Sequence, residues 1–351
     1  MGATASSGMW KTGESAQEQG LGYVPDAYQV PLRDRPSLFP DTVTVPLIDL
    51  GGLWKDAVQR SLVIKDIGNA CCRFGFFQIV NHGICQTVMD EALQAASSFF
   101  DSPTDEKMKY MSNDVHKPVR YATSFKDGVD KTQFWRVFLK HYAHPLEHWM
   151  GQWPENPPRY REKMGRFCAQ ARKVTVDLME AITEGLGLGP SYLTSKMEAG
   201  MQVMAVNCYP RCPNPEVALG LPPHCDYTCL TVVLQSSPGL QIMDLEDCTW
   251  KSVPKIPGAL QVHVGDHLEV LSNGLYKSVC HRAVLNSERT RFSIASLHSL
   301  GLDETMEPAE ELVGAQGKKY RGSSFRDFLN FLAANDLGKR KSFIDTLKIN
   351  Q

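Results

Sequence analysis

The sequence predicts a mainly β protein, an antiparallel sandwich or barrel with flanking helices. Short apolar runs separated by turn residues fill the region from 230 to 271. Pro238-Gly239, Gly265-Asp266 and Ser272-Asn273-Gly274 supply the turns. Many short strands at this spacing, bounded by Gly, Pro and Asn, are typical of such folds. The apolar runs that we interpret as strands are 230–234, 239–243, 260–264 and 267–271.

Length and composition limit the function classes. With 351 residues and 42% hydrophobic content, the chain can form one large β domain with helical additions, or two units. A formal net charge of −2 gives no basic surface for nucleic acid. No apolar run approaches the roughly 20 residues of a membrane helix, and no signal sequence opens the chain. We therefore expect a cytoplasmic, monomeric protein that acts on a small molecule.

The first 200 residues divide into two parts. Residues 1–44 form an irregular lead rich in Gly, Pro and Ser, and residues 45–200 form an N-terminal α/β module with a helical segment. Apolar residues at helical spacing predict helices over 57–71 and 88–99, with strands at 45–50 and 76–80. Ser102-Pro103 then starts a short third helix. The most regular helical pattern covers 159–184 and ends at a cluster of glycines.

The last part of the chain follows a predicted β core at 201–300. Phe325, Phe328, Leu329 and Leu332 fall on one face of a helix that ends near Gly338. We therefore expect residues 301–351 to form a C-terminal helical extension that packs on the core.

Two histidines and one aspartate in the predicted core have the pattern of an iron site. Side chains at i and i+2 of a strand share a face, so His224 and Asp226 project together while Cys225 points away. His281 can join them from another strand. Two imidazoles and one carboxylate on one face of an octahedral ion leave three positions open, the arrangement of non-haem Fe(II) oxygenases.

Arg291 and Ser293 form a second i, i+2 pair. A buried guanidinium needs an anion, and its planar fork matches a carboxylate through two charge-assisted hydrogen bonds. A cosubstrate with two carboxylates could bind iron with one of them and Arg291 with the other. In the strand before the first proline turn, Asn207 and Tyr209 also share a face, so both can reach a ligand.

Two other clusters in the sequence could compete for a metal. The spacings Cys208-x3-Cys212 and Cys225-x3-Cys229 are compatible with a four-thiolate zinc site. His263, Asp266 and His267 form another cluster, but its members do not share a strand face. We prefer reduced, buried thiols for the cysteines and assign neither cluster to metal.

Taken together, these motifs resemble the plant 2-oxoglutarate- and Fe(II)-dependent dioxygenases, the group of flavanone 3-hydroxylase, anthocyanidin synthase and the gibberellin oxidases. The resemblance covers roughly residues 45 to 300. Six motifs match in order: Gly-Phe-Phe-Gln-Ile-Val-Asn-His-Gly at 75–83, Asn-Cys-Tyr-Pro-Arg-Cys-Pro at 207–213, His224-x-Asp226, Ser-Asn-Gly-Leu-Tyr-Lys-Ser at 272–278, His281, and Arg291-x-Ser293.

The resemblance implies a double-stranded β-helix (jelly-roll) core that contains the catalytic site at 201–300. It implies Fe(II) held by His224, Asp226 and His281, and 2-oxoglutarate held by Arg291, Ser293 and Tyr209, with Asn207 beside them. O2 is the oxidant and ascorbate the expected reductant. The products are succinate, CO2 and an oxidised, usually hydroxylated, plant metabolite. A flavanone hydroxylated at C3 is our leading substrate prediction.

Residues 113–158 have no clear period and are rich in aromatic side chains. Such a segment is either a substrate-shaping loop or a cover for the core. Because this region borders the active site in the family, we predict substrate contacts for Tyr121, Phe125 and Phe134. Three alternative functions stay open: a hormone-oxidising or O-demethylating dioxygenase, an ascorbate-dependent ethylene-forming type of oxidase, and a catalytically silent cupin-like binding protein.

Overall fold

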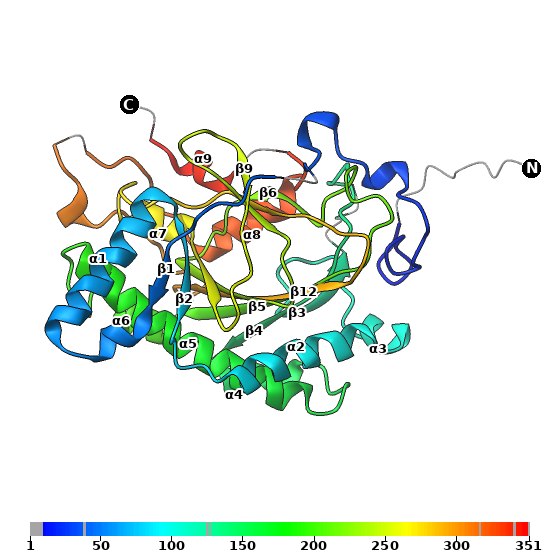
Figure 1. The fold of residues 1–351 in the computed structure, drawn as a ribbon, viewed down its shortest axis with the longest axis horizontal. Helices are drawn as coiled ribbons and strands as arrows, with labels where there is room; N and C mark the ends of the chain where they lie inside the picture. Colours follow the sequence, from blue (N-terminus) through cyan, green and yellow to red (C-terminus); the bar gives the residue numbers. More distant parts are fainter. Residues whose placement is uncertain are drawn as a thin grey trace, which may run out of the picture.

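Two β-sheets face each other in the protein, and helices cover the outer side of the larger one (Figure 1). The structure is a computed structural model that describes residues 10–37, 40–123, 126, 128–315, 317–339 and 342–349. The major sheet has eight strands in the order β1-β2-β10-β7-β12-β5-β4-β3, and the minor sheet has four in the order β6-β11-β8-β9. All strand pairs are antiparallel except β1 with β2.

The strands of the major sheet are β1 Leu47–Asp49, β2 Phe76–Val80, β3 Val119–Thr123, β4 Val137–His144, β5 Met201–Tyr209, β7 Leu230–Gln235, β10 Leu260–Val264 and β12 Arg291–Ser299. Those of the minor sheet are β6 Leu221–His224, β8 Leu240–Met243, β9 Trp250–Ser252 and β11 His281–Ala283. The α-helices are α1 Ala57–Arg73, α2 Gln86–Phe100, α3 Thr104–Met108, α4 Leu146–Trp149, α5 Tyr160–Gly185, α6 Thr194–Glu198, α7 Asp266–Leu271, α8 Phe325–Ala334 and α9 Phe343–Leu347. Short 3-10 helices are η1 Asp26–Tyr28, η2 Leu32–Asp34, η3 Leu50–Trp54, η4 Met150–Gln152 and η5 Glu310–Leu312.

Helix α5 supports the major sheet and confirms the predicted amphipathic pattern. Met164, Cys168, Ala171 and Leu178 lie on one stripe and are fully buried. In Figure 1, α5 and α2 run side by side below the strands. Strands β7 and β10 are buried along their whole length, because helices cover one face of the sheet and the cavity wall is the other. The polar residues Gln261 and His263 of β10 are therefore buried as well.

The predicted division at residue 200 does not separate two sheets. Strands β1 to β4 come from the N-terminal module, yet they lie in the same sheet as four strands of the 201–300 region. Two expectations about secondary structure were wrong. Residues 113–158 contain the strands β3 and β4, and residues 267–271 belong to helix α7.

The lead is irregular but packed. Tyr28 is buried with its ring edge-on to Trp135, with 5.4 Å between centroids. Gln17 donates its side-chain amide to the Arg136 carbonyl at 3.0 Å. The part of the lead from residue 10 onward therefore closes one end of the space between the sheets.

The C-terminal extension is helical, as expected, and covers the open side of the cavity. Helix α8 begins with a capping box in which Ser324 and Asp327 exchange side-chain to backbone hydrogen bonds. Phe328 stacks on Tyr227 at 4.6 Å, with an interplanar angle of 2°. Phe325, Phe328 and Leu329 all reach the cavity wall.

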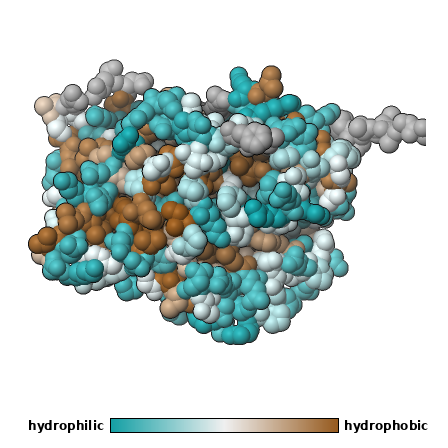
Figure 2. Space-filling view, viewed as in Figure 1, coloured by the Kyte–Doolittle hydropathy of each residue, from teal (hydrophilic) through white to brown (hydrophobic). Residues whose placement is uncertain are grey.

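The outer surface has hydrophobic areas on the face shown in Figure 2. Leu47, Trp54, Val58 and Leu62, from β1, η3 and α1, are about half or more exposed, from 48% to 68%. Among the residues described, no helix is both long enough and apolar enough to span a bilayer.

Candidate active site

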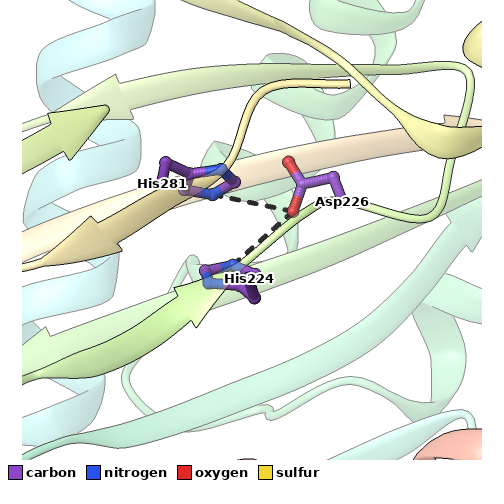
Figure 3. Close-up of side chains that lie close together, drawn as sticks. All are labelled: His224, Asp226 and His281. Carbon is purple, nitrogen blue, oxygen red and sulfur yellow. Dashed lines mark ion pairs between the residues drawn. The ribbon is translucent and has the colours of Figure 1, made fainter. Parts of the chain in front are cut away.

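Three side chains converge where the minor sheet faces the major one (Figure 3). His224 ends β6, His281 begins β11, and the two residues are paired across these antiparallel strands. Asp226 lies just beyond the end of β6. The Nε2 atoms of both histidines are 3.8 Å from Asp226 Oδ1, and one ligand atom from each residue lies within 4.8 Å of the others. This donor set fits a divalent iron ion.

Backbone carbonyls hold both imidazoles in the tautomer that ligation needs. His224 Nδ1 donates to the Pro222 carbonyl at 2.9 Å, and His281 Nδ1 donates to the Val279 carbonyl at 3.1 Å. Because a carbonyl only accepts, each Nδ1 carries the proton and each Nε2 presents a lone pair to the centre.

The electrostatics keep the three groups in their ligating forms. Burial acts to raise the pKa of Asp226, but the surrounding imidazoles of His281, His263 and His224 outweigh it and hold that pKa below its usual value. Burial lowers the pKa of His224 and of His281, which keeps the rings neutral. Two neutral imidazoles beside an ionised carboxylate are what a metal ion requires.

The predicted cosubstrate residues lie side by side on the major sheet. Arg291 pairs with Tyr209 across β12 and β5, and Ser293 pairs with Asn207. The Arg291 guanidinium is 5.0 Å from the centroid of the Tyr209 ring. Asn207 Nδ2 donates to Ser293 Oγ at 3.2 Å.

Arg291 is only partly satisfied. It is 3% exposed; its Nε donates to the Ser237 carbonyl and its Nη2 to Gln235 Oε1, both at 3.0 Å. The buried Nη1 has no protein partner. An unpaired donor on a buried cation is costly, so this atom is available to donate to an anionic partner.

His263 was missed as a neighbour of the metal site. It lies on β10 with Nδ1 3.5 Å from Asp226 Oδ2, and its ring centroid is 4.5 Å from that of His281. The competing cluster in which the sequence placed it does not form, because the His267 Nε2 is hydrogen-bonded to the Tyr227 hydroxyl instead. Gln261 and His263 lie two residues apart on one face of β10, and this spacing could have placed His263 on the inner face of the sheet, beside the triad.

The thiolate zinc site is not formed. Cys208, Cys212 and Cys229 are buried free thiols. Among the described residues, the triad is the one group of His, Cys, Asp or Glu with ligand atoms close enough for a metal.

A cavity of about 470 Å³ lies over the triad and reaches Arg291 and Ser293. Its walls come from both sheets and from the C-terminal helices. Tyr121 and Phe134 do not line it. Tyr121 packs against Phe99 and Phe100 and hydrogen-bonds Glu18, so its side chain lies in the core.

Phe134 also lies outside the cavity wall. Phe134 packs in a separate cluster with Val30 and Leu219, and Phe125 is outside the described residues. The same segment does reach the cavity, but through other side chains: Arg120, Lys126, Arg136, Phe138 and Lys140.

Comparison with known proteins agrees with this geometry. Residues 200–299 match the 2OG-Fe(II) oxygenase superfamily, and residues 45–156 match the family described as non-haem dioxygenase in morphine synthesis N-terminal. A rice protein, 2-oxoglutarate-dependent dioxygenase 21, chloroplastic, is 52% identical over 84% of this chain and 88% of its own length. The chain belongs to the 2OG-Fe(II) oxygenase superfamily. It is an Fe(II)- and 2-oxoglutarate-dependent dioxygenase, as the motifs indicated.

Further similarities support the family and its fold. Rice flavanone 3-dioxygenase 3 is 48% identical over 84% of this chain and 90% of its own length. The crystal structure of JOX2 in complex with 2OG, Fe and JA superposes with a TM-score of 0.83, at 29% identity, over 95% of this chain and 96% of that one. The jelly-roll prediction is confirmed, and the flanking helices belong to the same fold.

Proposed function

We propose that this dioxygenase hydroxylates a small aromatic plant metabolite at a C–H bond, with His224, Asp226 and His281 as its iron ligands. The observation that carries the proposal is the triad with Arg291 nearby, since these supply one site for a metal and one for a carboxylate in a single cavity. When bound, iron supplies the oxidising chemistry. The protein's own residues orient both ligands and limit access of water.

The proposed cosubstrate site uses four residues. Arg291 Nη1 and Ser293 Oγ would hold the far carboxylate of 2-oxoglutarate, and the Tyr209 ring lies against the guanidinium. Asn207 fixes Ser293 through its hydrogen bond. An ascorbate-dependent oxidase without 2-oxoglutarate is disfavoured, because it would leave Arg291 Nη1 buried and unpaired.

The first substrate to test is a flavanone, oxidised at C3, because a rice relative at 48% identity carries the name flavanone 3-dioxygenase 3. The aromatic and aliphatic wall of the cavity suits a flat ring system. A hormone-like acid is the second candidate, and the basic side chains of β3 and β4 are the observation that favours it. O-demethylation uses the same site with a different substrate pose.

The cellular location, the oligomeric state and the reductant are also proposals. A cytoplasmic monomer that uses ascorbate as reductant remains our expectation, although the name of the first rice relative includes the word chloroplastic. Cell fractionation tests the cytoplasmic location, and the solution mass of the purified protein tests the monomeric state. Omission of ascorbate from the assay tests its role as reductant.

The test of the proposed function is anaerobic binding followed by turnover. Fe(II) and 2-oxoglutarate together should produce a metal-to-ligand absorbance band, and O2 with the right metabolite should give succinate and a product heavier by one oxygen. Replacing His224, Asp226 or His281 by Ala should weaken Fe(II) binding more than roughly a hundredfold, beyond the effect of losing an outer-shell partner.

Cys225→Ser is the matched control for the triad variants, because Cys225 lies between two ligands without being one and should keep iron binding. A wild-type protein without the absorbance band would disprove the 2-oxoglutarate assignment. Loss of iron in Cys225→Ser with retention in Asp226→Ala would show that the ligand set is wrong.

A further inference from the structure

Three basic side chains, Arg120, Arg136 and Lys140, line the cavity at the end formed by β3 and β4. Arg120 on β3 pairs directly with Lys140 on β4, and Arg136 precedes β4. Phe138 lies between them, with the Arg120 guanidinium 5.2 Å and the Arg136 guanidinium 4.5 Å from its ring centroid. We call these four residues the basic cluster.

The part of the chain that the structure describes supplies no counter-ion to the basic cluster. None of the ion pairs formed between described residues includes Arg120, Arg136 or Lys140, whereas the nearby Lys126 is paired with Asp130 at 2.9 Å. Arg120 Nε donates to the Ser112 carbonyl and Lys140 Nζ to the Val115 carbonyl, at 2.7 Å each.

Arg136 shows the same shortage of acceptors. Its Nη1 donates to Asn207 Oδ1 at 3.1 Å, but its buried Nε has no partner. The other carboxylates of the cavity wall are already engaged. Asp226 belongs to the triad, and Asp336 Oδ1 accepts from the Gly338 amide at 2.9 Å. Holding three such cations together is unfavourable without an anion.

Arg136 borders the cosubstrate site through Asn207, whereas Arg120 and Lys140 lie apart from that site. The strand order β12-β5-β4-β3 places Lys140 two strands and Arg120 three strands from Arg291. At about 4.8 Å per strand, that separation is on the order of 10–14 Å. A carboxylate held by Arg291 therefore cannot also satisfy Arg120 and Lys140.

The space beside the cluster can hold the body of a ligand. Lys140 is followed across the sheet by Ala205 and then Ala295, two small residues that both line the cavity. Apolar side chains of α8 also contribute to the wall, among them Phe328 and Leu329. A flat apolar ring fits between such walls, and a planar carboxylate matches the guanidinium forks.

We propose that the substrate is an aromatic carboxylate whose acid group binds the basic cluster while its ring lies over Phe138 and below α8. This inference rests on the proposed function and narrows its substrate class. A neutral flavanone leaves the three cations unpaired, whereas an acid neutralises part of their charge. Arg120, Arg136 and Lys140 are thus specificity-determining residues.

The test compares acids with their neutral esters. Calorimetry measures binding of cinnamate, indole-3-acetate and 4-hydroxybenzoate, each beside its methyl ester, with naringenin as a neutral flavanone, to the protein loaded anaerobically with Fe(II) and 2-oxoglutarate. At least one acid should bind about tenfold more tightly than its ester. That acid should leave the 2-oxoglutarate absorbance band in place, because it does not occupy the Arg291 site.

Variants then assign the effect to the cluster. Lys140→Met and Arg120→Gln should each weaken binding of the preferred acid by roughly ten- to a hundredfold, the value of a charge-assisted hydrogen bond. Ester binding should change by less than about twofold. Lys65→Met, which removes an exposed cation from α1 outside the cavity wall, should change neither.

Two results would overturn the inference: esters or naringenin that bind as tightly as every acid, or acid binding unchanged in a folded Lys140→Met variant. The half-buried Lys140 gives a usable variant even if replacement of the buried Arg120 prevents folding. Absence of the absorbance band in the wild type would count against the proposed function instead, because calorimetry of the acids does not depend on that band.

Discussion

At the scale of single residues, Arg291 has one side-chain nitrogen for which the described protein supplies no hydrogen-bond acceptor. Nε and Nη2 are held by the Ser237 carbonyl and Gln235, while Nη1 is buried without a partner. Arg291→Lys keeps the charge but loses the planar fork. We expect the dissociation constant of 2-oxoglutarate to rise roughly ten- to a hundredfold, with Fe(II) affinity unchanged, as measured by anaerobic titration of the absorbance band. An unaffected variant would remove Arg291 from the site.

Lys140 should reduce the stability of the protein below neutral pH. Burial, and then the charge of Arg120, lowers the pKa of Lys140 from 10.5 to about 7. Between about pH 7 and 10.5 the unfolded chain binds the proton and the native protein does not, so this group makes stability rise with pH. Below about 7 the native protein must also protonate the buried amine, and the penalty is complete.

Lys140→Met removes this penalty. The melting temperature should therefore increase, most strongly at pH 6, and the gain should shrink as the pH rises from about 7 toward 10. Parallel melts of the wild type, Lys140→Met and the surface control Lys65→Met at pH 6 and 9.5 measure it. A loss of stability in Lys140→Met at pH 6 would show that the amine is a structural partner instead of a ligand-binding group.

At the scale of elements, the iron ligands were predictable because their pattern is local. His224 and Asp226 are two residues apart, and Arg291 and Ser293 repeat that spacing. The substrate wall was not predictable in this way. Strand β4 is buried on both faces except at Lys140 and His144, so it shows no polar alternation, and its pairing with β3 decides which side chains reach the cavity.

Helix α7 illustrates the same limit. All six of its residues are buried, including the polar Asp266, His267 and Glu269. Its polar residues therefore do not mark a solvent-facing side, and a short run of this kind is compatible with a strand. The prediction that Tyr121 and Phe134 contact the substrate was wrong for a related reason. Composition suggested a lining role, whereas their side chains fill the core and Arg120 projects into the cavity instead.

The turn before α7 fixes the loop that carries Asp226. Gly265 donates its amide to the Cys229 carbonyl, and the Asp266 amide donates to the Asp226 carbonyl at 2.8 Å. A Cβ on Gly265 would lie 1.9 Å from the Thr228 carbonyl oxygen and 2.9 Å from that of Asp226. Both are backbone atoms, so the Asp226 loop itself must move.

Gly265→Ala should therefore weaken Fe(II) binding by at least about tenfold, an effect of the size seen when support of a ligand is lost, and it should lower the melting temperature. Gly151→Ala is the control, because a Cβ there meets nothing within 4 Å. Metal titration together with thermal melts separates the two effects. Iron affinity equal to that of the wild type would mean that the loop accommodates the methyl group without moving Asp226.

At the scale of the whole molecule, the cavity depends on segments that are distant in the sequence. The lead packs on the strand region at one end, the two sheets form the walls, and α8 and α9 cover the remaining side (Figure 1). Inside are a metal site, an unsatisfied arginine and a basic cluster, all of which cost stability when empty. Stability and ligand occupancy are therefore linked.

This linkage predicts a stepwise thermal shift. A ligand at a hundred times its dissociation constant stabilises the native state by about 2.7 kcal/mol, which corresponds to a melting-temperature increase on the order of 5 °C for a large domain. Fe(II) should give one such increase and 2-oxoglutarate a second, measured anaerobically. His224→Ala should lose the increase caused by Fe(II) and most of the increase caused by 2-oxoglutarate. Arg291→Lys should keep the Fe(II) increase and lose only the 2-oxoglutarate increase. Equal shifts in all three proteins would place ligand binding outside the cavity, because neither variant alters any other surface.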